Sequence, residues 1–445
     1  MTTMKKKLLM TNNELITIRE FEYLCVTKPE GRNGFHQIKA KPFKALKNFV
    51  LENRREDNGD LNELLAFTSK KGIGECVQAR NYVGVISLQD GPTIEILPKI
   101  DATGTENTEQ EKQCLLNMLQ ALLHIPLRTS GNTRLAVSQL NIFETLIAMF
   151  LEEAKDLIKR GLRSDYSPIE SNEHFLKGRL LFSQNIRHNA AHQERFYVCY
   201  DEYSLNRAEN RILKSTLTLL ARKSKDSKNR KAIKLALSIL VDVPLSKNID
   251  ADLAKCRNDR TTASYQAIIV WCEIFLKGES FSTFNGSSVA VALLFPMEKL
   301  FEAYVAQQIK YAFSSEWAVR TQEGSRYLYD NSGKGLLKPD IICRSKSNAS
   351  HIAVLDTKWK RIKSGSDISQ ADLYQMYAYH RKFDALETML IYPASKDAPF
   401  SEEPFAQYKA DDASLTVFMY DLSSPEAEKI SLENLKRVLL KAKEH

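Results

Sequence analysis

The spacing of the apolar residues changes twice along the chain, and these changes constrain the fold more than any other feature. Short β-rich runs alternate with turns as far as about Lys99, apolar residues recur every three or four positions from Cys114 to about Gly278, and short apolar runs alternate with helical stretches from about Met297. A chain of 445 residues is also longer than one hydrophobic core usually serves. We therefore predict an α/β (α+β multidomain) protein with a mixed α/β N-terminal domain at 1–105, a mainly helical middle region at 106–285 and an α/β/α domain at 286–445.

The N-terminal domain ends in two strand-like runs. Tyr82–Leu88 and Thr93–Leu97 are rich in β-branched residues, and Gln89–Pro92 between them has the composition of a turn, so these segments predict a β-hairpin. Apolar residues at helical spacing in Phe43–Val50 make the domain mixed. The polar segment Asp101–Gln110 predicts a linker or an exposed loop.

Two stretches interrupt the helical pattern of the middle region. Gly161–Tyr200 lacks helical periodicity and predicts an irregular insert. A dense basic run from Lys223 to Lys234 could hold phosphate or an acidic partner surface, but we favour a solvated loop between two helices.

Other polar residues of the middle region have structural interpretations. His188 and His192 are four positions apart with no third ligand nearby, which predicts a surface pair rather than a metal site. Asn206, Glu209 and Asn210 lie at the start of a predicted helix, where we interpret them as caps or interdomain contacts.

Charge and hydropathy limit the partners of the chain. The 63 basic and 55 acidic residues give a net charge of +8, which weakly favours a polyanion. The apolar run Leu8–Met10 is too short for a signal peptide or a membrane span, so we expect a cytoplasmic protein with no membrane partner. The seven cysteines form no C-x-x-C pair, which predicts neither a disulfide framework nor a zinc site.

Chemistry is concentrated in two segments of the last third. Asp340 follows Pro339 and opens an apolar run, and Asp356 and Lys358 end the strongly apolar run that starts at Ile352. Side chains two apart on a strand share a face, so Asp356 and Lys358 point the same way. If the two strands are neighbours, Asp340 joins them.

These residue types suit phosphodiester hydrolysis. A divalent cation prefers carboxylate oxygens, polarises the scissile phosphate and makes a nucleophile from water. A neighbouring lysine holds or helps deprotonate the water and offsets charge on the phosphate. Two similar triplets are decoys, because Glu153-Ala154-Lys155 lies in a helical pattern and Asp226-Ser227-Lys228 in a charged stretch with no strand before it. Surface carboxylates at strand ends are the alternative interpretation.

Two further segments add candidates. Glu302 lies among apolar residues of a helix predicted from Met297, where a carboxylate could complete the metal ligands, although a solvated helix glutamate is an equal alternative. Gln375 and Tyr379 are four apart on one helical face, where they could contact a phosphate or orient the lysine. Tyrosines packed on an amphipathic helix are the alternative.

Together these motifs resemble the PD-(D/E)xK nuclease superfamily in its RecB-like form with a Q-x-x-x-Y helix. The chain also resembles the McrC family, the nuclease subunit of McrBC-type modification-dependent restriction systems. The segments that carry this second resemblance are Ile94–Ile100, Lys159–Leu162 with Tyr166, Leu176–Leu180, Asp201–Ser204, Asn206–Leu213 and Leu355–Lys360.

The resemblance implies a restriction-endonuclease-like domain in which Asp340, Asp356 and Glu302 hold Mg²⁺, with Mn²⁺ able to substitute, and Lys358 and Gln375 assist cleavage of double-stranded DNA. It also implies that the N-terminal and helical parts dock on a ring of McrB-like AAA+ GTPase subunits that recognises methylated cytosine, and that the chain stimulates their NTPase. No G-x-x-x-x-G-K-[ST] loop is present, so we expect this chain to bind no nucleotide itself.

Two other functions remain open from the sequence. The chain could be an adaptor that activates the partner's NTPase and carries a degenerate nuclease fold. A stand-alone RecB-like nuclease is disfavoured, because some 280 residues precede the catalytic segment. The sequence leaves open the DNA site, GTP or ATP as the partner's nucleotide, the stoichiometry, and the use of the Leu97–Lys99 and Gly178–Arg179 motifs.

Overall fold

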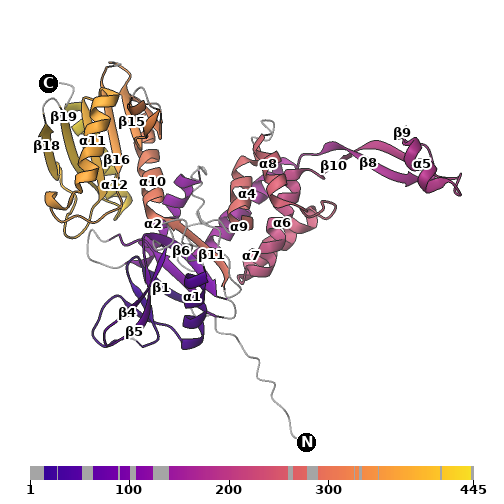
Figure 1. The fold of residues 1–445 in the computed structure, drawn as a ribbon, viewed down its shortest axis with the longest axis horizontal. Coiled ribbons are helices and arrows are strands. Elements are labelled where there is room, and N and C mark those ends of the chain that lie inside the picture. The colour runs from indigo at the N-terminus through magenta and orange to yellow at the C-terminus, as the bar shows by residue number, and fades with distance from the viewer. Residues whose placement is uncertain are drawn as a thin grey trace, which may run out of the picture. The chain divides into compact units, whose positions relative to one another are not determined.

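The chain forms two compact units. Unit 1 joins residues 1–130 to residues 280–445, and unit 2 comprises residues 131–279 (Figure 1). The N-terminal and C-terminal parts, which the sequence assigns to separate domains, therefore share one unit. The computed structural model describes residues 15–27, 29–52, 64–88, 91–100, 107–123, 140–258, 264–277, 289–324, 326–329, 333–348, 350–410 and 413–441.

The N-terminal part of unit 1 contains two four-stranded sheets, β1-β7-β6-β11 and β3-β2-β5-β4. The predicted hairpin is confirmed, because β6 and β7 pair antiparallel with Ser87 opposite Thr93. Its turn residues Gln89 and Asp90 lie outside the described residues. The elements are β1 (Leu15–Arg19), β2 (Tyr23–Cys25), β3 (Phe35–Gln37), α1 (Ala40–Glu52), β4 (Leu65–Lys70), β5 (Gly74–Ala79), β6 (Tyr82–Leu88), β7 (Thr93–Leu97) and β11 (Val289–Pro296).

Two elements move the predicted domain boundaries. β11 pairs antiparallel with β6, so a segment assigned to the C-terminal domain forms a strand that completes an N-terminal sheet. The helix α2 (Thr108–Leu122), assigned to the middle region, belongs to unit 1, where it packs on α10 and Lys112 Nζ lies 2.9 Å from Glu95 Oε2. Apolar periodicity identifies a helix but not the partner on which the helix packs.

The predicted linker is shorter than the sequence suggests. Asn107 caps α2, because its Oδ1 accepts hydrogen bonds from the backbone N of Glu109 at 3.1 Å and of Gln110 at 3.3 Å. Residues 101–106 of the predicted linker lie outside the described residues.

A six-stranded mixed sheet with helices on both faces forms the C-terminal part of unit 1, in the order β12-β15-β16-β17-β19-β18 (Figure 1). α11 covers one face, where Met376 packs in one core with Val354. On the other face Phe301 of α10 contacts Trp359. This arrangement is the predicted α/β/α domain. Its elements are α10 (Met297–Ala312), β12 (Trp317–Thr321), β15 (Ile341–Ser345), β16 (Ile352–Thr357), α11 (Gln370–Phe383), β17 (Glu387–Pro393), β18 (Ala406–Ala410), β19 (Ala413–Tyr420) and α12 (Pro425–Lys441).

Unit 2 is mainly helical, as predicted for the middle region. Its helices pack around buried Phe150, Leu217 and Trp271. None of the helices in the described part of the chain combines the length and apolarity needed to cross a bilayer. The helices of unit 2 are α4 (Ile142–Arg160), α5 (Phe182–Asn189), α6 (Ala208–Lys223), α7 (Ser227–Ile239), α8 (Ile249–Asn258) and α9 (Gln266–Lys277).

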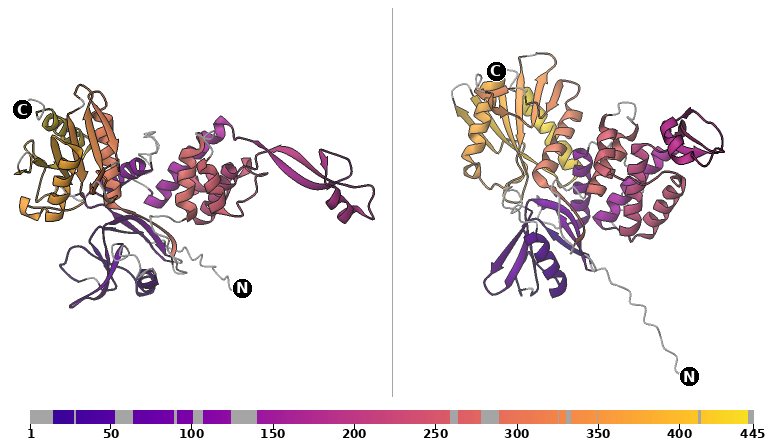
Figure 2. Two further views of the ribbon diagram at one scale, coloured as in Figure 1. Left: turned by 45° about the horizontal axis from the view of Figure 1, so that its top comes forward. Right: turned by 45° about the vertical axis from the view of Figure 1, so that its right-hand side comes forward.

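The predicted irregular insert is wrong, because residues 161–200 contribute to a regular β-arm. β8 (Asp165–Glu173) pairs antiparallel with β10 (Phe196–Ser204), and β9 (Arg179–Leu180) joins the other edge of β10. The arm projects from the helices of unit 2 in each view of Figure 2. β8 contains polar residues on both faces and is nowhere fully buried, so the sequence lacks the apolar alternation by which strands are recognised.

The arm also explains the glycine of the Gly178–Arg179 motif. Gly178 has a φ of +70°, and a Cβ placed there would lie 2.5 Å from the backbone O of Cys199. Only glycine satisfies both the left-handed backbone and this close approach.

The loop predicted for the basic run is also wrong. Most of the run lies on α7, whose N-terminus is capped by Asp226 through a 2.8 Å hydrogen bond from the backbone N of Asn229. Few apolar residues are needed here, because α7 is largely exposed and buries mainly Ile233 and Ala236. Among the polar residues of unit 2, His188 stacks on Tyr197.

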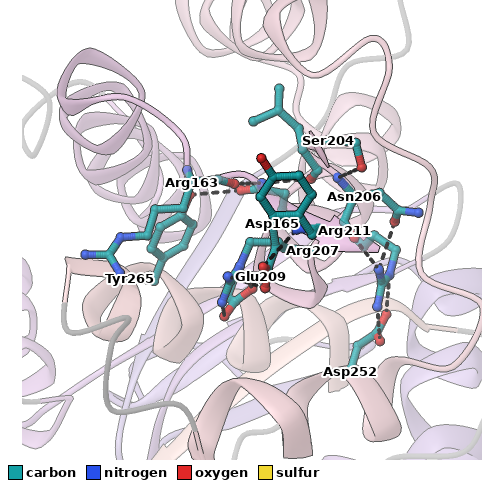
Figure 3. A network of polar contacts seen from close by, with 12 residues as sticks. Arg163, Asp165, Ser204, Asn206, Arg207, Glu209, Arg211, Asp252 and Tyr265 are labelled. Carbon is teal, nitrogen blue, oxygen red and sulfur yellow. Dashed lines mark hydrogen bonds and ion pairs between the residues drawn. The ribbon is translucent and has the colours of Figure 1, made fainter. Parts of the chain in front are cut away.

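The residues at the start of α6 form a polar network at the base of the arm (Figure 3). Asn210 is fully buried, donates to the backbone O of Arg163 at 3.0 Å and accepts from the Tyr265 hydroxyl at 3.0 Å. Glu209 accepts from Arg207, which also donates to Asp165 Oδ2 of β8 at 2.8 Å. These contacts lie within unit 2, so Glu209 and Asn210 hold the arm to the helices instead of capping α6.

Candidate functional site

Neighbouring strands bring Asp340 and Asp356 together. β15 follows Asp340 directly and pairs antiparallel with β16, with Ile341 opposite Leu355. Asp340 Oδ2 accepts hydrogen bonds from the backbone N of Thr357 at 2.7 Å and from the Thr357 hydroxyl at 2.8 Å. The carboxylate of Asp340 is therefore fixed beside the residue that follows Asp356.

Lys358 points to the same side of the sheet as Asp356. Its Nζ lies 2.5 Å from Asp356 Oδ2, and the Asp356 side chain is 2% exposed. The backbone N of Lys358 donates to the O of Ile391 at 2.9 Å, which extends the pairing with β17 one residue beyond β16. The strand alternation expected from the sequence is thus present at these positions.

Burial and neighbouring charges perturb all three groups. Burial, together with the neighbouring carboxylates of Asp356 and Glu302, raises the pKa of Asp340 to about 7. Burial also raises the pKa of Asp356, against the lowering effect of Lys358. Burial opposes the charge of Lys358, but Asp356, Asp372 and Asp340 outweigh it and raise its pKa. The cluster holds more negative charge than one lysine offsets.

The helix α11 fixes the lysine. Gln375 Oε1 accepts from Lys358 Nζ at 3.1 Å, and Gln375 Nε2 donates to the Tyr379 hydroxyl at 2.8 Å and approaches Asp356 Oδ1 at 3.5 Å. Ser369 caps the helix by accepting from the backbone N of Asp372 at 3.1 Å. Gln375 and Tyr379 are therefore positioned to orient Lys358.

Asp372 is a site residue that the sequence does not single out. Its buried carboxylate lies 4.0 Å from Lys358 Nζ and 3.4 Å from Lys360 Nζ, and it accepts from the Tyr392 hydroxyl at 3.4 Å. An acidic residue in the first turn of a helix has an ordinary electrostatic explanation, so its position in the sequence carries no signal of a site.

Glu302 lies at the margin of the site. Lys299 Nζ is 3.3 Å from its Oε2, and Gln322 donates to its Oε1. Among the described residues no three acidic, histidine or cysteine side chains lie close enough to form a complete metal site, so Glu302 does not complete one with Asp340 and Asp356. Gln322 is a second site residue that the sequence does not single out. Its backbone N donates to the O of Asp340 at 3.0 Å, and nothing in the sequence predicts its left-handed φ of 50°.

The chemistry of this donor set fits Mg²⁺. Asp340 and Asp356 each have a raised pKa, and a divalent cation would offset the burial and mutual repulsion that raise it. Oδ2 of Asp356 is buried, and its partner is Lys358 Nζ at 2.5 Å, so the carboxylate already faces a positive charge. Mg²⁺ commonly uses one or two carboxylates and keeps several waters, so a third carboxylate is not required.

The chain that follows β16 is held by the N-terminal part of unit 1. Trp359 Nε1 lies 3.1 Å and 3.2 Å from the two carboxylate oxygens of Glu20, which also accepts from the backbone N of Lys99 at 3.2 Å. Arg361 Nη2 donates to the O of Lys99 at 3.0 Å. These four residues, Glu20, Lys99, Trp359 and Arg361, line a cavity of 270 Å³. The motif around Lys99 thus has a structural role that sequence reasoning missed.

The fold and this site define a multidomain α/β chain whose mixed-sheet domain carries a buried carboxylate–lysine cluster at the ends of adjacent strands. The chain belongs to the McrBC family, because the model of the family described as "McrBC 5-methylcytosine restriction system component" matches residues 77–393. Comparison with curated proteins gives no match.

Two solved structures are similar to the chain. A chain of the half-complex from the tetradecameric assembly of Thermococcus gammatolerans McrB AAA+ hexamers with bound McrC is 18% identical, with a TM-score of 0.65, 95% of this chain covered and 100% of that chain. A chain of the Thermococcus gammatolerans McrBC complex is 19% identical, with a TM-score of 0.47, 67% of this chain covered and 88% of that chain. The similarity to the first of these chains supports the fold described above.

Proposed function

We propose that this chain is a Mg²⁺-dependent DNA endonuclease subunit of a restriction system. The observation that carries the proposal is the convergence of Asp340, Asp356 and Lys358 at the ends of β15 and β16. A cluster that places buried Asp356 beside half-buried Asp340 and Lys358 is costly to fold without a charged ligand. Its perturbed pKa values are typical of functional sites.

Each residue has a separate part in the proposed chemistry. Asp340 and Asp356 would hold Mg²⁺, which supplies Lewis-acid polarisation of the scissile phosphate and activation of a water. Lys358 keeps its proton, since the carboxylates raise its pKa, and it donates to the water or to a phosphate oxygen as charge develops. Gln375 holds the lysine in place. The Glu302 carboxylate helps to raise the pKa of Asp340 and accepts a hydrogen bond from Gln322.

We also propose that an McrB-like AAA+ GTPase ring is the partner, that this ring recognises modified cytosine in double-stranded DNA, and that the chain stimulates its NTPase. The matched Thermococcus assembly contains McrB AAA+ hexamers with bound McrC. The arm of unit 2 supports a protein partner, because it exposes large apolar side chains that monomers seldom leave in water: Tyr166, Phe175, Leu176, Phe182 and Ile186.

An adaptor with a degenerate nuclease fold is the second candidate. The observation that favours it is that the Glu302 carboxylate is held by Lys299 and Gln322 and not turned to the other two carboxylates. In that case the chain would stimulate the partner's NTPase and would cut no DNA.

Reconstitution of the chain with its AAA+ partner separates the two candidates. Asp356→Asn and Lys358→Ala are expected to lower cleavage of methylated DNA by roughly 10²–10³-fold or more, because each removes charge from the reacting centre. NTPase stimulation should stay unchanged. Lys155→Ala, an exposed lysine of the decoy triplet on α4, is the matched control. Cleavage near the wild-type rate in both site variants would reject the nuclease assignment.

A further inference from the structure

A hairpin with both ends at the candidate site interrupts the chain between β12 and β15. It consists of β13 (Arg326–Tyr329) and β14 (Lys334–Leu337), which pair antiparallel. Gln322, which touches both Glu302 and the backbone O of Asp340, precedes it. Lys338 and Pro339 connect β14 to Asp340. Any large ligand of the carboxylates therefore lies next to this hairpin.

One face of the hairpin is fastened to α11. Arg326 donates to the backbone O of Lys382, lies 3.2 Å from Asp384 Oδ2, and stacks over the ring of Phe383 at 5.4 Å from its centroid. β13 also packs against α11. Because Arg326 uses several contacts at once, the hairpin has a fixed orientation on the domain.

The opposite face of the hairpin is open to solvent. Side chains alternate along a strand, so Tyr327 and Tyr329 point away from Arg326, and Leu336 pairs across the ladder with Tyr327. Tyr327 is 41%, Tyr329 65% and Leu336 51% exposed. Lys334 pairs with Tyr329 and shares this face. We call these residues, with the exposed Lys338 that continues the alternation, the outer face.

The charge of the outer face indicates which kind of ligand binds there. Among the described residues the outer face carries two basic side chains, Lys334 and Lys338, and no acidic one. Arg326 lies on the other face beside Asp384, and Asp330, which falls between the two strands in the sequence, lies outside the described residues. Positive charge with exposed aromatic rings suits a nucleic acid, whose phosphates and bases bind these two residue types. The major groove of duplex DNA admits a two-stranded β-ribbon, and its phosphates flank the ribbon on both sides.

We propose that the outer face of the β13–β14 hairpin binds the major groove of duplex DNA next to the scissile phosphate. Lys334 and Lys338 contact phosphates, and Tyr327, Tyr329 and Leu336 contact the groove. This inference rests on the proposed nuclease function and names the part of the chain that holds its substrate. The contact is independent of base modification, because phosphates position a duplex without reading its sequence.

The test measures DNA affinity of the full-length chain without cleavage. A fluorescent 24-base-pair unmodified duplex is titrated with the chain in Ca²⁺, and anisotropy is followed over a range of salt concentrations. Lys338→Ala should make the slope of log K against log salt less steep by about 0.9, the value for one lost phosphate contact. The double variant Tyr327→Ala/Tyr329→Ala should weaken binding by about tenfold or more at fixed salt.

Matched controls lie on α10. Lys310 is exposed and Tyr311 is 85% exposed, and both lie about two turns or more along the helix from Glu302. Lys310→Ala and Tyr311→Ala should leave affinity and salt slope unchanged.

Two outcomes overturn the inference. Wild-type affinity and slope in the hairpin variants would show that the outer face does not bind DNA. Loss of NTPase stimulation with unchanged DNA binding would assign the face to the protein partner. Failure of the wild-type complex to cut any DNA would instead reject the proposed function, since the anisotropy measurement needs no cleavage.

Discussion

Glu20 is expected to make the stability of unit 1 depend on pH, and Glu20→Gln is expected to remove that dependence. Glu20 is 1% exposed, and burial raises the pKa of its carboxyl from 4.5 to about 7. A carboxyl that holds its proton more tightly in the folded chain stabilises the fold fully below pH 4.5, and this contribution is lost as the pH rises to about 7. Glutamine has no proton to lose.

The structure sets the size of this effect. A difference of about 2.5 pKa units corresponds to about 3 kcal/mol of unfolding free energy. Glutamine keeps one oxygen for Trp359 Nε1 but loses the second acceptor, which costs about 1 kcal/mol. Glu20→Gln should therefore be about 1 kcal/mol less stable than the wild type at pH 4.5 and about 2 kcal/mol more stable at pH 8.

Urea unfolding followed by tryptophan fluorescence measures the difference, because two of the three tryptophans, Trp317 and Trp359, lie in unit 1. Glu298→Gln is the matched control, because Glu298 is exposed and lines the same 270 Å³ cavity as Glu20. If the gap between the wild type and Glu20→Gln were equal at pH 4.5 and pH 8, the burial argument for Glu20 would be refuted.

Two further predictions concern the lysine and the arm. Gln375→Leu removes the acceptor of Lys358 Nζ and should lower cleavage by the reconstituted complex about 10- to 100-fold through misplacement of the lysine, with partner binding intact; an unchanged rate would remove Gln375 from the site. Gly178 has a φ of +70°, and Gly178→Ala places a Cβ 2.5 Å from the backbone O of Cys199. We expect a loss of about 1–3 kcal/mol in the local stability of the arm, which should accelerate hydrogen exchange in β8 and β10. Wild-type exchange protection would contradict this.

The candidate site was predictable where one element contains the whole pattern. Asp356 and Lys358 share a face because they are two apart on the extended chain of β16 and the residue that follows it. Gln375 and Tyr379 share a face because they are four apart on α11. Asp340 joins them because β15 and β16 are neighbouring strands, as the sequence analysis required. Local periodicity was sufficient for these residues.

Long-range partners were not predictable in this way. Glu20 and Trp359 are 339 positions apart, and nothing local marks either as half of a pair. Gln322 contributes through a left-handed backbone, and Asp372 looks like an ordinary acidic residue at a helix start. The same limit explains the domains, since the sequence predicts α2 as a helix and predicts no strand at β11, and it does not show that both elements pack on the N-terminal sheets.

Calorimetric titration of Mn²⁺ into the purified chain tests most directly whether Asp340 and Asp356 hold one cation. We expect one Mn²⁺ per wild-type chain, loss of this binding in Asp340→Asn and in Asp356→Asn, and its retention in Lys358→Ala, which removes no ligand. Equal Mn²⁺ binding in the wild type and in both asparagine variants would contradict the assignment of these two side chains as the metal ligands.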